Sequence, residues 1–114
     1  MAQTKFRVVL VTCGKLAEAR KIARAVVDQR LAACVNLSTS PVESIYRWKG
    51  KVEVAREYLL IMKTAKGQLA ELEKLVAKHH SYEAPEFMVL PVVGGSRKYL
   101  NWLAESVAVT KLAK

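Results

Sequence analysis

The order of strand-like and helix-like patterns along this chain leaves few folds open. A β-branched apolar run, Phe6 to Val11, is followed by apolar residues at helical spacing between Lys15 and Leu31. Residues 33–37 again have strand character. We interpret these three segments as the two strands and the connecting helix of a right-handed βαβ unit.

The middle of the chain predicts an unusually long hairpin. Pro41 interrupts the strand pattern, because proline has no amide hydrogen to donate to a sheet. The pattern resumes over residues 42–48, turns at residues 49–51 and returns over residues 52–63. These arms extend beyond the first strand and have no partner strand left in the same chain. An open edge of this kind pairs with another copy.

The last third of the chain supplies two more helices and one more strand. Thr64 is expected to cap a second helix, which Pro85 cannot continue. Residues 87–90 predict a last buried strand, and Ser96 is expected to cap a third helix. We therefore predict an α+β fold of the ferredoxin-like, split βαβ type: βαββαβ with an antiparallel sheet and an added C-terminal helix, in a single domain over residues 1–114.

Composition narrows the class of protein. A chain of 114 residues that is 52 % hydrophobic can build a core without disulfides. The apolar run from Val8 to Val11 is too short for a bilayer span or a signal peptide, and two cysteines fit a reducing compartment. We expect a soluble, cytoplasmic protein without a membrane partner.

The charge balance alone does not indicate nucleic-acid binding. The 19 Lys and Arg exceed the 10 Asp and Glu, giving a net charge of +9, but the basic residues are scattered along the chain. An RNA-recognition sheet needs a basic-Gly-aromatic run on a central strand, whereas residues 58–61 are apolar. We expect a solvated basic surface and no nucleic-acid partner.

The sheet face without helices predicts self-association. It would carry apolar residues, and burying a few hundred Å² of such surface at about 25 cal/mol per Å² stabilises an assembly by several kcal/mol. Tyr46, Trp48 and Tyr58 on the long arms favour the same conclusion. The alternative is that these aromatics fold back as core residues of a monomer.

The direction of the second helix predicts a cluster at one rim of the sheet. This helix runs back towards Cys13, so His79 and His80 should reach the same rim. Copper and zinc favour imidazole and thiolate, so His79, His80 and Cys13 are candidate metal ligands. Adjacent helical residues point about 100° apart, so both histidines converge only if the helix has unwound there. Otherwise both imidazoles interact only with the helix terminus.

The second cysteine belongs elsewhere. Cys34 lies near the start of the second strand, whereas Cys13 follows the end of the first. Because both strands of a βαβ unit run the same way, the two thiols are expected at opposite ends of the sheet, out of reach of a disulfide or a shared metal. Cys34 follows an alanine pair on a packed strand and is interpreted as a small buried thiol.

Several segments between Val8 and Val107 carry a family resemblance. They are Cys34-Val35-Asn36, Ser44-Ile45-Tyr46-Arg47-Trp48-Lys49-Gly50, Glu57, Leu59 through Lys63-Thr64, His79-His80-Ser81-Tyr82-Glu83-Ala84-Pro85-Glu86, Leu90-Pro91 and Tyr99-Leu100-Asn101-Trp102-Leu103. In this order they closely resemble CutA, the divalent-cation tolerance protein family. The resemblance covers almost the whole chain.

The resemblance implies an assembly and a function class. It implies a homotrimer of ferredoxin-like subunits whose hairpins pair between neighbours, similar in architecture to the PII signalling proteins. It also implies an association with copper and other divalent metals, and no established enzymatic reaction. The alternative is a PII-like signalling or scaffold trimer that binds a small ligand or protein partner in clefts between subunits.

The resemblance also bears on single residues. Family members described as copper-binding use the two histidines that match His79 and His80, together with a cysteine on the first strand. That cysteine position is Val11 here, and Cys13 lies two residues further on. Cys13 lies on the same side of the strand if the strand continues that far.

Overall fold

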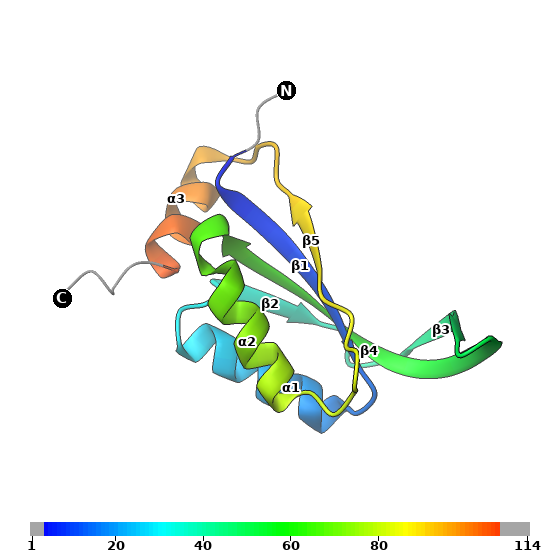
Figure 1. Ribbon diagram of the computed structural model, residues 1–114. Coiled ribbons are helices and arrows are strands. Elements are labelled where there is room, and N and C mark those ends of the chain that lie inside the picture. Colours follow the sequence, from blue (N-terminus) through cyan, green and yellow to red (C-terminus); the bar gives the residue numbers. More distant parts are fainter. Residues whose placement is uncertain (1–3, 108–114) are drawn as a thin grey trace.

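The computed structural model describes residues 4–107, which form one antiparallel sheet with helices packed on it (Figure 1). The elements are β1 (Phe6–Cys13), α1 (Leu16–Asp28), β2 (Cys34–Leu37), β3 (Val42–Trp48), β4 (Lys51–Ala65), a 3₁₀ turn (Lys66–Gln68), α2 (Leu69–His79), β5 (Met88–Pro91) and α3 (Arg97–Ser106). The strand order is β2-β4-β1-β5, and β3 pairs with β4 outside this row.

This topology confirms the ferredoxin-like prediction. β1 pairs antiparallel with both β4 and β5, and β2 pairs antiparallel with β4. β1 and β2 are therefore parallel strands separated by β4, which is the split βαβ arrangement. The helices α1 and α2 lie side by side across one face of the sheet (Figure 1).

The main core lies between that face and the two helices. Alternate residues of β1, namely Val9, Val11 and Cys13, are fully buried there. The helices contribute the fully buried residues Ile22 and Val26 from α1 with Leu72 and Val76 from α2, and β4 contributes Leu60 and Met62. β1 runs as far as Cys13, so Val11 and Cys13 lie on the same face of the strand. This meets the condition under which Cys13 could replace the family cysteine that position 11 lacks.

The opposite face of the sheet is covered only at one end. There α3 buries Leu103 against Phe6 and Ala65 in a second, smaller core. The strand β5 is exposed along its whole length, with Met88 at 55 %. The expectation of a buried last strand is wrong, because β5 pairs with β1 alone and forms an edge of the sheet.

The hairpin β3–β4 projects away from the rest of the molecule (Figure 1). One half of β4 pairs with β1 and β2, while the other half pairs only with β3. Ile45 is 65 % exposed, and Tyr46 and Trp48 are exposed as well. These two aromatics do not fold back as core residues, whereas Tyr58 packs against the main core.

The two predicted helix caps have different outcomes. The Ser96 side chain accepts a hydrogen bond from the amide of Tyr99, as predicted for the start of α3. Thr64 instead lies inside β4, and its buried hydroxyl donates to the carbonyl of Leu31 at 2.6 Å. α2 begins only at Leu69, after the 3₁₀ turn, so the prediction of a Thr64 cap is wrong.

Candidate functional site

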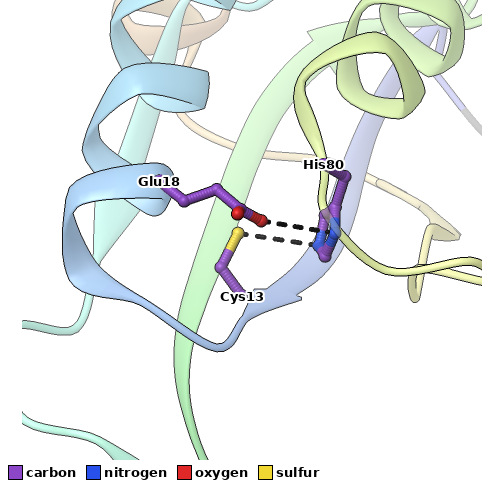
Figure 2. Close-up of side chains that lie close together, drawn as sticks. All are labelled: Cys13, Glu18 and His80. Atoms are coloured by element: carbon purple, nitrogen blue, oxygen red, sulfur yellow. Dashed lines mark hydrogen bonds and ion pairs between the residues drawn. The ribbon is translucent and has the colours of Figure 1, made fainter.

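The end of β1, the first turn of α1 and the end of α2 meet at one rim of the sheet. Cys13, Glu18 and His80 come together there (Figure 2). Their potential ligand atoms all lie within 4.8 Å of one another. Within residues 4–107 this is the one group of three such side chains close enough to share a metal ion.

Local backbone structure directs each of the three side chains inward. Cys13 is the last residue of β1, on its core-facing side. α1 begins at Leu16 and places Glu18 in its first turn. α2 ends at His79, and His80 follows in an extended conformation with φ −89° and ψ 140°. This change of backbone direction turns the His80 ring towards β1.

Hydrogen bonds assign the protonation of the His80 ring. Nε2 donates to the carbonyl of Thr12 at 2.7 Å, and Nδ1 accepts from the amide of Tyr82 at 3.1 Å. A ring that donates from one nitrogen and accepts at the other is the neutral imidazole, here with its hydrogen on Nε2. The side chain has no exposed surface. His80 therefore joins the end of α2 to the end of β1.

Glu18 supports the chain that follows His80. Its Oε2 accepts a hydrogen bond from the amide of Ser81 at 3.1 Å and lies 3.4 Å from His80 Nδ1. Since Nδ1 already accepts from a backbone amide, the contact between Glu18 and the ring is not a charged pair. The carboxylate remains a negative charge beside the thiol of Cys13.

The environment of Cys13 keeps it protonated. Sγ lies 3.7 Å from His80 Nε2 and is fully buried. Burial raises the pKa of the Cys13 thiol to about 12, and the negative charges of Glu18 and Glu57 add to this effect. A protonated, buried thiol is a weak nucleophile, so the cluster is not arranged for covalent catalysis.

The donor set fits a borderline or soft divalent ion. Sulfur, imidazole nitrogen and a single carboxylate are ligands that copper and zinc accept. A cation would have to displace the thiol proton, and it would compete with the hydrogen bonds that both ring nitrogens make. The residues present can hold such an ion only if these contacts rearrange.

The structure brings two of the three predicted metal ligands together and leaves the third outside the group. Cys13 and His80 meet, but His79 is the half-buried last residue of α2 and lies outside the group. Glu18 was not among the sequence candidates. Its position in the first turn after the Cys13-Gly14 strand end is the signal that could have identified it, since that turn lies at the same rim.

A second contact extends the site towards the hairpin. The Tyr82 hydroxyl donates to Glu57 Oε2 at 2.8 Å, and burial together with Glu57 raises the pKa of the tyrosine. Gly14 makes room for this contact, because a Cβ atom there would lie 2.9 Å from the Tyr82 hydroxyl oxygen.

Cys34 lies apart from the cluster, as predicted. It is half-buried rather than buried, opposite Lys63 of β4, whereas Cys13 lies opposite Tyr58. Its Sγ is 3.6 Å from Lys63 Nζ and 3.7 Å from the Tyr99 hydroxyl. Both cysteines are free thiols.

Comparison with known proteins gives a consistent result. The sequence profile of the family described as CutA1 divalent ion tolerance protein matches residues 7–106. The Divalent-cation tolerance protein CutA of Thermus thermophilus is 44 % identical over 99 residues, covering 87 % of this chain and 95 % of the relative. Protein CutA, chloroplastic, of Arabidopsis thaliana is also 44 % identical over 99 residues, with 87 % of this chain and 54 % of the relative covered. The chain thus spans about half the length of this plant relative.

Solved structures agree with the sequence matches. The divalent cation tolerance protein CutA1 of Thermus thermophilus superimposes with a TM-score of 0.87 at 43 % identity, covering 90 % of this chain and 99 % of that one. The structure described as the periplasmic divalent cation tolerance protein CutA of Archaeoglobus fulgidus has a TM-score of 0.86 at 35 % identity, with the same coverage.

The comparisons contradict the expected cytoplasmic location. The Arabidopsis relative is named as chloroplastic and the Archaeoglobus structure is described as periplasmic. Cysteine number and a short apolar run do not encode the compartment, because the same folded domain occurs in several. Separately, no helix within residues 4–107 is both long and apolar enough to cross a bilayer.

Proposed function

The chain belongs to the CutA1 divalent ion tolerance protein family, and on that premise we propose that it is a homotrimer that binds copper or another divalent ion and takes part in the response to such ions. The observation that carries the proposal is the group formed by Cys13, Glu18 and His80. His79 is the neighbouring residue that could join this group if the end of α2 unwinds further.

The chemistry of the group favours a thiophilic ion. A hard ion such as Mg²⁺ or Ca²⁺ is held by several oxygen ligands, and Glu18 is the sole carboxylate within the group. Copper and zinc bind thiolate and imidazole. The positive charge of the ion also offsets the negative charge of Glu18, which otherwise disfavours the Cys13 thiolate.

Exposed apolar surface supports the assembly. Ile45 on the hairpin and Met88 on β5 are more than half exposed, and both lie where no helix covers the sheet. The unpaired edge of the hairpin offers main-chain hydrogen bonds to another copy. A second and third copy would cover this surface.

The arrangement of the cluster favours a binding function over a catalytic one, and we propose that the protein is not an enzyme. The cluster holds its thiol protonated and its imidazole in two protein hydrogen bonds. Neither group is free to act as a nucleophile or a general base in this arrangement.

The test compares metal binding in matched variants. Isothermal titration with Zn²⁺ and with Cu²⁺ should show one ion per subunit and release of about one proton near pH 7, because the Cys13 thiol must ionise. Thermal denaturation should show that each bound ion raises the melting temperature. Proton release is measured by repeating the titration in buffers of different ionisation enthalpy. Native mass spectrometry of the same samples counts subunits and bound ions.

The variants identify the ligands. Cys13→Ser and His80→Gln should each weaken binding by more than about tenfold. His79→Gln should weaken binding as well if the end of α2 unwinds and brings His79 into the group, whereas Glu71→Gln, at an exposed acid of α2, is the control and should retain binding. Equal binding by wild type and His80→Gln would contradict the assignment of the site. If the wild-type protein binds neither ion in these titrations, the proposed function is contradicted.

A further inference from the structure

The cavity at the base of the hairpin has a composition that does not match the rest of this basic protein. It measures about 700 Å³ and is lined by residues of β3, by Glu57 of β4, by Thr12 of β1 and by the segment that joins α2 to β5. Its walls include three carboxylates and three aromatic rings: Glu57, Glu83, Glu86, Tyr46, Trp48 and Tyr82. Lys and Arg outnumber Asp and Glu by 19 to 10 in the chain, yet among residues 4–107 no Lys, Arg or His lines the cavity.

Glu57 is the central feature of this cavity. It is only 7 % exposed, and its Oε2 accepts the hydrogen bond from Tyr82. Within residues 4–107 no basic side chain forms an ion pair with it. Its second oxygen, Oε1, has no hydrogen-bond donor among those residues. Because no fully buried side-chain oxygen there lacks a partner, Oε1 keeps some solvent-accessible surface. A nearly buried carboxylate with one neutral donor is a charge without a counter-ion.

Glu86 is affected by the same negative charge of Glu57, which no cation neutralises among residues 4–107. Burial raises the pKa of this carboxyl group, and the negative charge of Glu57 raises it further. No positive group in the described part of the chain opposes these two effects. A cation bound beside Glu57 and Glu86 would offset their repulsion and compensate for the cost of their desolvation.

The spacing of the carboxylates argues against a metal ion. Within the described residues, Cys13, Glu18 and His80 form the only group of three or more His, Cys, Asp or Glu side chains whose ligand atoms lie close enough together to share an ion. The three glutamates of the cavity do not form such a group. A ligand that satisfies them has to be larger than a single ion.

The aromatic walls indicate the kind of cation. Ammonium and guanidinium groups are attracted to the faces of Trp and Tyr rings, and alkyl chains pack against the ring surfaces. Tyr46 and Trp48 come from one strand of the hairpin, and Tyr82 comes from the segment after α2. Their rings and the carboxylates together line a space large enough for a small organic molecule.

We propose that this cavity binds an organic cation, an alkylammonium or alkylguanidinium group that is neutralised by Glu57 and packed between Trp48 and Tyr82. The group has two sources of the same chemistry: a free small amine, or a Lys or Arg side chain of a second copy of this chain. The cavity is lined by none of the three side chains of the metal-ligand group, although Tyr82 lies between the two and its amide donates to the His80 ring. The proposal does not depend on metal binding.

The first arm of the test uses a charged probe and its neutral isostere. Wild-type protein is titrated with n-butylguanidinium and with n-butylurea, which has nearly the same shape without the charge, and binding is followed by calorimetry. If the source is a free amine, the cation binds and the urea does not. Glu57→Gln keeps the acceptor for Tyr82 but removes the charge, and should weaken binding by about tenfold or more. Glu71→Gln, an exposed acid on α2, is the control for net charge.

The second arm detects a cation supplied by another copy. In that case n-butylguanidinium does not bind the assembled wild type, and Glu57→Gln raises the dissociation constant of self-association in sedimentation equilibrium while Glu71→Gln does not. Trp48→Leu, at an exposed ring, is a second cavity variant that keeps the test valid if Glu57→Gln folds poorly. It should weaken probe binding in the first arm or self-association in the second, as expected for Glu57→Gln.

Three results would overturn the proposal. One is that neither arm responds to Glu57→Gln or Trp48→Leu. Another is equal binding of the urea and the guanidinium, which would make the cavity apolar rather than cation-selective. The third is displacement of the probe by millimolar Ca²⁺ at constant ionic strength, which would identify an acidic metal site instead.

Discussion

At the scale of single residues, the rim of the sheet shows what sequence can and cannot predict. The arrival of Cys13 and His80 at one rim follows from the direction of β1 and α2, which the apolar patterns predict. The apolar patterns do not predict that His80 joins the group while His79 stays outside it, because this depends on the residue at which α2 ends. The tautomer of His80 is set by two backbone groups, the carbonyl of Thr12 and the amide of Tyr82, which lie 68 and 2 residues away in the sequence.

Cys13 gives a prediction about pH. Its pKa is raised from 9.0 to about 12 in the folded protein, so the unfolded chain loses the thiol proton first as pH rises. The resulting stabilisation is complete below pH 9 and declines from there, by about 2 kcal/mol near pH 10.5. Urea unfolding between pH 8 and 11 should show this decline in wild type and in Cys34→Ala. Cys13→Ala should lack that component, and an unchanged slope in Cys13→Ala would contradict the burial effect.

Gly14 gives a prediction about packing. A methyl group at this position would lie 2.9 Å from the hydroxyl oxygen of Tyr82, which Glu57 holds in place. Gly14→Ala should therefore displace the ring and cost about 1–2 kcal/mol of unfolding free energy. Tyr82→Phe should be destabilising in wild type but nearly neutral in the Gly14→Ala background. Additive effects in this double-mutant cycle would show that the two residues are independent.

At the scale of elements, alternation and helical spacing identify the strands and helices, but burial depends on neighbours far along the chain. The apolar run at residues 87–90 does form a strand, yet β5 is exposed because its outer edge and one face are uncovered. Thr64 has the composition of a cap, yet its hydroxyl is bonded to Leu31 across the fold. Ser96 behaves as its local sequence predicts, since a helix cap needs only a donor three residues later.

The cap of α3 can be tested directly. Ser96→Ala removes the acceptor for the Tyr99 amide and should destabilise the protein by about 1 kcal/mol. The effect should reach global unfolding because α3 carries Leu103 into the second core. Ser96→Asn, which keeps an acceptor, should restore most of the loss in chemical denaturation. Equal stability of Ser96→Ala and Ser96→Asn would exclude a capping role.

At the scale of the whole molecule, the described part of the chain is elongated, with extents of 46 × 33 × 24 Å. The hairpin and α3 lie towards opposite ends (Figure 1). The sequence predicts the projecting arms from their length alone, because a strand longer than its partners has to leave the sheet. The volume and charge of the cavity at the base of the hairpin could not be predicted, since they depend on how the segment after α2 crosses β4.

Self-association should depend on the hairpin. Ile45 is 65 % exposed in the single chain, so Ile45→Lys should cost the protomer little stability but remove apolar surface from the proposed contact. In sedimentation equilibrium, wild type should behave as a trimer at micromolar concentration, and Ile45→Lys should dissociate at least about tenfold more readily. Val27→Lys, at an exposed residue of α1, is the control. The same mass for all three proteins as monomers would contradict the assembly.

The unequal accessibility of the two thiols has a practical consequence. Cys13 is buried and protonated, whereas Cys34 is half-buried at the start of β2. A maleimide dye should therefore attach at one position of the natural sequence, without any engineered cysteine. Trp102 on α3 packs against Tyr99 near Cys34 and would also act as a donor, so Trp102→Phe is needed to leave Trp48 on the hairpin as the fluorescent donor. Such a dye would then report distances within and between labelled subunits, and so follow assembly in real time.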